Sequence, residues 1–97
     1  MAKKGCLTLE RRKICKDRIK RIEGQIRGLA KMVDEDRYCV DILQQISSVH
    51  EALRGLGKVL MQNYLEICAT DALRSKDQKR QEEIYNEMMD VIYKFAK

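Results

Sequence analysis

The stretch 39–68 reads CVDILQQISSVHEALRGLGKVLMQNYLEIC, and it decides the fold because its apolar side chains recur every three or four residues. The pattern crosses the whole stretch without a change of phase, although Gly55 and Gly57 fall inside it. We interpret these two glycines as sites of close helix contact rather than as a break. The spacing therefore predicts one long helix over about residues 37–69.

Two further segments show the same periodicity. Apolar residues between Cys15 and Val33 follow steps of three and four and predict a helix over about 9–33. A third apolar stripe predicts a helix over about 76–96, with Ser75 as its expected cap. The 97 residues include no Pro and no Trp, and no stretch alternates as a strand would. We therefore expect an all-α protein with one domain over the whole chain.

The two cysteines of the long helix, Cys39 and Cys68, are separated by 29 residues. Along one straight helix this separation is about 43 Å, so these thiols can act together only between two chains. A helix of this length also leaves apolar surface that one short partner helix cannot cover. We therefore expect a homodimer in which the long helices of two chains lie antiparallel.

Positive charge is concentrated in residues 1–21, which hold nine Lys or Arg against Glu10 and Asp17, whereas the whole chain carries +5. Such a surface attracts polyanions, of which DNA is the expected one, although a solvated, flexible basic arm over residues 1–8 is the plainer alternative. No helix-turn-helix pattern is present, so we expect contacts mainly to phosphates. The candidate DNA-binding residues are Arg12, Lys13, Arg18, Lys20, Arg21, Arg54 and Lys58.

Other functional classes fit the sequence less well. No apolar run is long enough to span a membrane and the N-terminus does not resemble a signal peptide, so we expect a cytoplasmic protein with reduced cysteines. The sequence has one histidine, no Gly-rich phosphate loop and no catalytic triad spacing, which argues against an enzyme. A structural helical adaptor would explain the periodicity but not the thiols or the basic segment.

The four cysteines differ in their positions. Cys15 lies on the apolar stripe of the first helix, where it is expected to pack as a small apolar residue. Cys6 lies in the N-terminal arm and is either an accessory thiol or without a role. Cys39 falls in the first turn of the long helix, where the helix dipole and Arg37 favour the thiolate, and Cys68 lies at the opposite end. We predict that Cys39 is the attacking sulfur and Cys68 the resolving one.

Three stretches have a familiar form: RIKRIEGQIRG at 18–28, MVDEDRYCVDILQQIS at 32–47 and NYLEIC at 63–68. Their order and spacing resemble the CsoR/RcnR family of bacterial repressors over nearly the whole chain. The resemblance implies a three-helix protomer, a four-helix-bundle dimer and a disc-shaped dimer of dimers. It also implies a repressor that binds double-stranded operator DNA until a small effector binds the protein.

The resemblance further implies a site for Cu(I) made by Cys39 of one chain together with a His and Cys68 of its partner. Here Tyr64 stands where that His belongs, and a phenol is a poor ligand for a soft cation. The remaining pair of thiols resembles the persulfide-sensing, CstR-like branch. In that branch a sulfane-sulfur donor modifies one cysteine, and the second closes a bridge between subunits.

Three other residues are placed near this site by the resemblance. Tyr38 and Glu83 match a pair that surrounds the ligands in copper-sensing relatives. Cys6 lies beside Leu7, near the N-terminal residue used by nickel, cobalt and aldehyde sensors, and it could take part if the arm folds onto the site. We predict a persulfide-responsive repressor, with a Cu(I)-responsive repressor as the alternative and another electrophile or metal as a third. No cofactor is required, and Cu(I) enters only as an effector.

Overall fold

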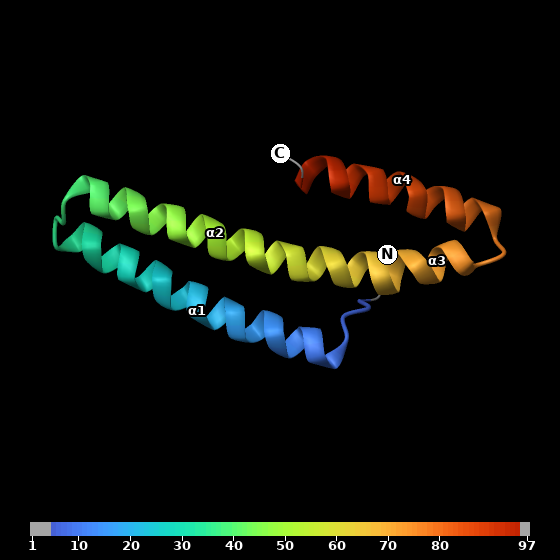
Figure 1. The fold of residues 1–97 in the computed structure, drawn as a ribbon, viewed down its shortest axis with the longest axis horizontal. Helices are drawn as coiled ribbons and strands as arrows, with labels where there is room; N and C mark the ends of the chain where they lie inside the picture. The colour runs from blue at the N-terminus through green and yellow to red at the C-terminus, as the bar shows by residue number, and fades with distance from the viewer. Residues whose placement is uncertain (1–4, 96–97) are drawn as a thin grey trace. The chain divides into compact units, whose positions relative to one another are not determined.

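The computed structural model describes residues 5–95, and their backbone is helical apart from short connections (Figure 1). The elements in chain order are α1 (Leu9–Asp34), α2 (Cys39–Asn63), η1 (Tyr64–Ala69), α3 (Thr70–Arg74) and α4 (Gln78–Phe95). No strand occurs between residues 5 and 95. Because α2, η1 and α3 follow one another without a non-helical residue, the described chain has three helical segments. The all-α prediction with a three-helix protomer is confirmed.

The chain falls into two compact units. One unit is Leu9–Leu60, and the other combines the described residues of Met1–Thr8 with those of Met61–Lys97. The first unit contains α1 and most of α2. The second contains residues 5–8, the end of α2, η1, α3 and α4. A single domain over the whole chain stays a prediction.

The first unit is a helical hairpin whose turn is closed by backbone hydrogen bonds. The Arg37 N–H donates to the Met32 carbonyl at 3.0 Å, and the Asp36 N–H donates to the Val33 carbonyl at 3.1 Å. This pair of bonds is the Schellman arrangement that ends many helices. It requires a left-handed residue, and Asp36 takes that place with φ of 53°. The turn therefore satisfies the last carbonyls of α1 at the cost of an unfavourable backbone conformation.

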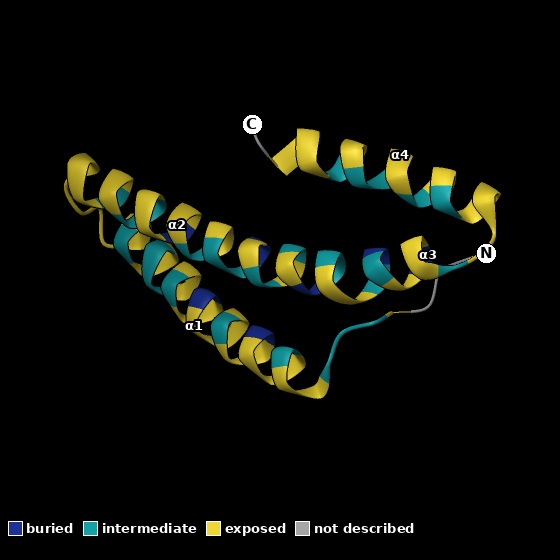
Figure 2. Cartoon of the chain, turned by 45° about the vertical axis from the view of Figure 1, so that its right-hand side comes forward, coloured by how far each residue is buried: buried dark blue, intermediate teal, exposed yellow. Residues whose placement is uncertain are grey.

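Burial in the first unit is limited to small patches on the helices (Figure 2). Cys15, Ile22 and Val49 are its buried apolar side chains. Ile19 and Ile26 belong to the apolar stripe predicted for the first helix, yet they are 42% and 49% exposed. The hairpin alone therefore covers only part of its apolar stripe, and the remainder faces solvent.

The predicted long helix changes character after Asn63. Residues Tyr64–Ala69 form a π-helix, in which each backbone N–H bonds to a carbonyl five residues earlier. The Thr70 hydroxyl donates to the Leu65 carbonyl at 2.8 Å, which satisfies a carbonyl at the wide turn. No Pro or Gly marks this place in the sequence, so the spacing gave no reason to expect a change.

The last helix begins at Gln78, and its cap is Asp77 rather than the predicted Ser75. The Asp77 carboxylate accepts a hydrogen bond from the Lys79 N–H at 3.1 Å, and its carbonyl accepts one from the Gln81 N–H at 3.1 Å. Ser75 has an extended backbone and accepts a bond from the Asp77 N–H instead. The prediction of Ser75 as the cap was wrong. Asp77, two residues later, is better placed to cap the helix, and the Ser75 side chain instead stabilises the preceding turn.

α4 folds back against η1 and α3 (Figure 1). Ala69 and Ala72 are buried in this unit, and their small side chains suit a close approach of helices. None of the helices in the described part of the chain combines the length and the apolar character needed to cross a membrane. The fold thus places the end of the long helical run beside α4, and this region holds the candidate site.

Candidate functional site

The second unit contains an open pocket of about 760 Å³. Its lining includes Cys6 from the N-terminal segment, Tyr64 and Cys68 from η1, and Glu83 and Glu87 from α4. Four of these residues were predicted site residues, and they come from three separate parts of the sequence. The pocket therefore gathers sulfur atoms, a phenol and carboxylates on one surface of one chain.

The Tyr64 hydroxyl at this pocket is already engaged in a hydrogen bond. Its hydroxyl donates a hydrogen bond to a carboxylate oxygen of Glu87 at 2.8 Å. Burial of the phenol, and then the hydrogen bond to Glu87 and its negative charge, raise the pKa of Tyr64 from 10.0 to about 12. The Tyr64 hydroxyl consequently keeps its proton at neutral pH and remains a poor ligand for a soft cation.

Cys6 and Cys68 are joined as a disulfide within the chain, with their Cα atoms 6.0 Å apart and a sequence separation of 62. Residues 1–4 of the predicted flexible arm lie outside the described residues. Its described part, residues 5–8, is tied to the second unit by this bond and by Asn63. The Asn63 amide donates to the Cys6 carbonyl at 3.3 Å and accepts from the Thr8 N–H at 3.4 Å. Residues 5–8 therefore lie against the pocket, which was the condition for Cys6 to take part.

Cys39 belongs to the first unit, where it is the first residue of α2. The carbonyl of Tyr38 accepts hydrogen bonds from the N–H groups of Asp41 and Ile42, so Tyr38 precedes the helix as its cap. Cys39 is an exposed free thiol, and the ring of Tyr38 is also exposed. Cys15, the other free thiol among the described residues, is buried. Of the two free thiols, Cys39 is the one open to an effector.

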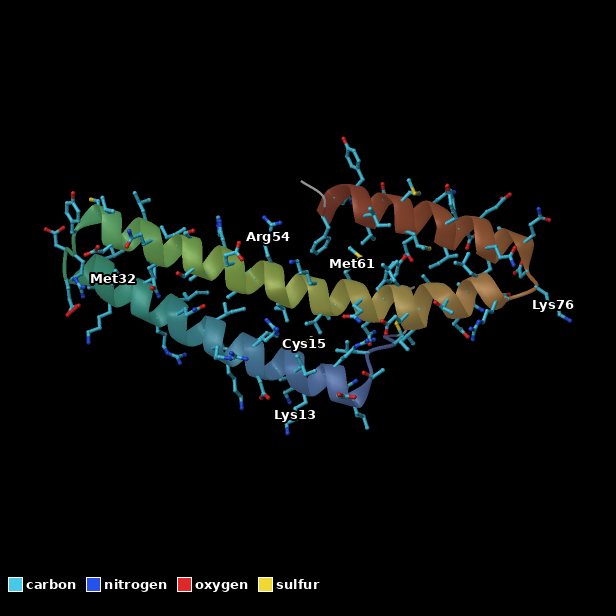
Figure 3. The ribbon with its side chains drawn as sticks, in the orientation of Figure 1. Lys13, Cys15, Met32, Arg54, Met61 and Lys76 are labelled. Atoms are coloured by element: carbon cyan, nitrogen blue, oxygen red, sulfur yellow. A yellow bond between two sulfur atoms is a disulfide. The ribbon has the colours of Figure 1, made fainter. Side chains whose placement is uncertain are left out.

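The predicted DNA-binding residues all lie in the first unit. Arg18 is only partly exposed, and a Cβ added at Gly55 would lie 2.8 Å from an Nη atom of its guanidinium. This places the Arg18 side chain along α2. In Figure 3 Lys13 points away from α2 and Arg54 points away from α1, so these two cations lie on opposite sides of the hairpin. The exposed cations are Arg12, Lys13, Lys20, Arg21, Arg54 and Lys58.

Two residues of the site were missed from the sequence. Asn63 is only 3% exposed and holds the N-terminal segment through both ends of its side-chain amide. A polar residue inside the apolar stripe of the long helix is the signal that could have found it. Glu87 follows Glu83 by four residues and so shares its face of α4, which is the signal that was available for Glu87. The described residues contain no group of three His, Cys, Asp or Glu side chains placed to hold a metal ion.

Comparison with known proteins places these features in a family. A family model described as "Metal-sensitive transcriptional repressor" matches residues 11–94. The copper-sensing transcriptional repressor CsoR of Bacillus subtilis is 46% identical over 81 residues, which is 84% of this chain and 77% of that protein. The copper-sensing transcriptional repressor RicR of Mycobacterium tuberculosis is 48% identical over 56 residues, 58% of each chain.

A solved structure is also similar. The crystal structure of the copper-sensing repressor CsoR with Cu(I) from Geobacillus thermodenitrificans shares 42% identity, with a TM-score of 0.81 over 100% of this chain and 95% of that one. The helical fold and these matches define a class of metal-sensing bacterial regulators. The chain belongs to the family of metal-sensitive transcriptional repressors, and it is accordingly a repressor rather than an enzyme.

Proposed function

We propose that this chain binds double-stranded operator DNA in its metal-free state and releases it on binding Cu(I). The similar repressors from Bacillus subtilis and Mycobacterium tuberculosis are named copper-sensing, and the similar solved structure is that of a CsoR with Cu(I). Thiolate sulfur is a ligand that Cu(I) prefers. These relatives favour Cu(I) over the persulfide effector that the sequence alone favoured.

The proposed ligands are the thiolates of Cys39 and Cys68. The observation that carries the proposal is the accessibility of both positions: Cys39 is exposed at the start of α2, and Cys68 lines the pocket. Once the bond to Cys6 is reduced, Cys68 is a free thiol. Tyr64, with its pKa raised to about 12, supplies no anionic oxygen at neutral pH. The donor set is therefore rich in sulfur, which fits a soft monovalent cation.

Assembly of two or more chains completes this site. The sequence separation of 29 between Cys39 and Cys68 corresponds to about 43 Å of straight helix, so Cys39 of a second copy is the expected partner of Cys68. The exposed apolar side chains of the hairpin, such as Ile26 and Leu43, support self-association. We propose an antiparallel dimer of long helices, and a homotetramer built from two such dimers.

DNA binding is assigned to the basic residues of the hairpin. Arg12, Lys13, Lys20 and Arg21 are exposed on α1, and their charges suit phosphate contacts. Arg54 and Lys58 on α2 would add phosphate contacts from a different side of the hairpin than the cations of α1. Joining Cys39 and Cys68 of two chains through an effector would change how the helices of the assembly are tilted. The match of the basic surface to DNA would then be lost.

A persulfide sensor is the second candidate, because Tyr64 replaces an imidazole and Cys68 already forms a sulfur–sulfur bond within the chain. In this mechanism the Cys39 thiolate attacks the outer sulfur of an organic persulfide and releases the organic thiol. Cys68 of a second copy then attacks the modified Cys39 sulfur and releases hydrogen sulfide, which leaves a disulfide between the subunits. The same two cysteines serve both candidates.

The test begins with a DNA fragment selected from genomic DNA by the metal-free, reduced protein. Cu(I) and an organic persulfide are then added separately, and DNA release is followed by fluorescence anisotropy. Release by Cu(I) at stoichiometric concentration supports the main proposal, and release by persulfide alone supports the second candidate. Failure of the reduced protein to select any fragment would contradict both.

The matched variants are Cys39→Ser and Cys15→Ala. Cys39→Ser should bind the selected DNA as the unaltered protein does but should no longer release it with effector. Cys15→Ala removes a buried thiol outside the pocket and should leave the effector response in place. A full response in Cys39→Ser would remove Cys39 from the mechanism.

A further inference from the structure

The pocket presents a second sulfur beside Cys68, from the same chain. Cys6 precedes α1 and Cys68 lies in η1, yet their Cα atoms are only 6.0 Å apart. Because they form a disulfide, their two sulfur atoms lie next to each other in the pocket wall. When the bond is reduced by two electrons and two protons, two thiols face that place.

The position of Cys6 does not depend on the disulfide alone. Asn63 is almost fully buried, and its amide holds the backbone at Cys6 and at Thr8, on either side of Leu7. Two hydrogen bonds to a buried side chain fix the short segment against the end of α2. The N-terminal segment is therefore docked by its main chain, and the Cys6 side chain is directed to Cys68.

Because Asn63 holds the backbone on both sides of Leu7, the Cys6 side chain is already placed beside Cys68 before any metal ion binds. In a reducing compartment, where a DNA-binding regulator is expected to work, the disulfide would be opened and Cys6 and Cys68 would be two thiols. The Tyr64 phenol on the same pocket wall is occupied by Glu87 and keeps its proton. Sulfur from Cys6 is the soft donor that the chain itself brings to Cys68.

We propose that Cys6 is a third sulfur ligand of the Cu(I) site, supplied by the same chain as Cys68 and taking the place of the imidazole that Tyr64 does not provide. The inference rests on the proposed function and extends it. The site then consists of Cys6 and Cys68 from one chain and Cys39 from a second copy. Binding releases the thiol protons to solvent and involves no change of oxidation state.

The test compares the full-length protein with Cys6→Ser, both reduced with a phosphine and handled without oxygen. Cu(I) affinity is measured by competition with a chromophoric Cu(I) chelator, and X-ray absorption counts the sulfur ligands. We expect three sulfur ligands in the unaltered protein and two in Cys6→Ser. We also expect an affinity lower by about tenfold to a hundredfold in the variant. Cys15→Ala is the matched control and should match the unaltered protein in both measurements.

Asn63→Ala provides a second test in which every sulfur is kept. Loss of the two hydrogen bonds should free the N-terminal segment and weaken Cu(I) binding, and circular dichroism will establish that the helices remain. Two sulfur ligands and equal affinities in the unaltered protein and Cys6→Ser would overturn the inference while leaving Cu(I) sensing intact. Absence of any Cu(I) binding by the unaltered protein would instead overturn the proposed function.

Discussion

The Tyr64 hydroxyl donates a 2.8 Å hydrogen bond to Glu87, which lies 23 residues further along the chain. This contact links η1 to α4 across the pocket that also contains Cys68. It keeps the Tyr64 hydroxyl hydrogen-bonded and protonated at neutral pH. The same relationship also gives the first prediction.

Glu87→Gln should lower the pKa of Tyr64 from about 12 toward its ordinary value of 10.0, because the variant removes a negative charge and a strong acceptor. Ultraviolet titration of the tyrosines to alkaline pH measures this change. Since the folded pKa is raised, the contribution of Tyr64 to stability is complete below pH 10 and is lost as pH rises through about 12. Glu83→Gln keeps the Tyr64–Glu87 bond and is the control. An unchanged titration in Glu87→Gln would contradict the assignment.

Tyr64→His should raise the affinity for Cu(I), because a neutral imidazole beside Cys68 adds a nitrogen ligand at neutral pH. Chelator competition measures the gain, which we expect to be about tenfold or more. Tyr85→His, at an exposed position of α4, supplies the same imidazole outside the pocket and should have no effect. No gain in Tyr64→His would count against a metal site at this pocket.

Asp36→Gly should stabilise the protein by about 1 kcal/mol, since glycine adopts the left-handed backbone at φ of 53° without a steric penalty. Urea unfolding at one fixed protein concentration measures the difference. Ala30→Gly lies inside α1 and should destabilise by about 1 kcal/mol, which separates a local conformational effect from a general effect of glycine. Equal destabilisation by both substitutions would refute the explanation.

Arg21→Ala should weaken DNA binding and reduce the slope of log affinity against log salt by about 1, because one phosphate contact is lost. The comparison is made by anisotropy over about 50 to 200 mM salt. Lys31→Ala removes another exposed cation, near the end of α1, that we do not assign to DNA. Identical slopes in the two variants would show that α1 binds DNA only through its net charge.

Maleimide labelling without reductant should modify Cys39 in the folded protein and reach Cys15 only after unfolding, because Cys39 is exposed and Cys15 is buried. Peptide mapping should find Cys6 and Cys68 linked within one chain. After phosphine reduction both become available to the reagent. A link between Cys39 and Cys68 of two chains would instead favour the persulfide mechanism.

The periodicity of apolar residues was enough to predict the presence of the helices. The first helix was predicted over 9–33 and is observed as Leu9–Asp34, because apolar spacing of three and four residues reports a buried helix face directly. The π-helical turn at Tyr64–Ala69 was not predicted, since no Gly or Pro marks it and it is stabilised by a side chain outside it, Thr70. Similarly, the sequence pattern predicted Ser75 as the cap, but the cap is Asp77. The two residues lie in the same turn, and either could accept hydrogen bonds from its backbone N–H groups.

The sequence by itself determined the helical class and the family, because these depend on local spacing and on residue identity. Only the tertiary structure brought Cys6 to Cys68 and Tyr64 to Glu87, since these partners are separated by 62 and 23 residues. Such contacts depend on how the chain folds back between elements. A helical repeat shows which side of each helix is apolar, but it does not show which distant segment will cover the opposite side.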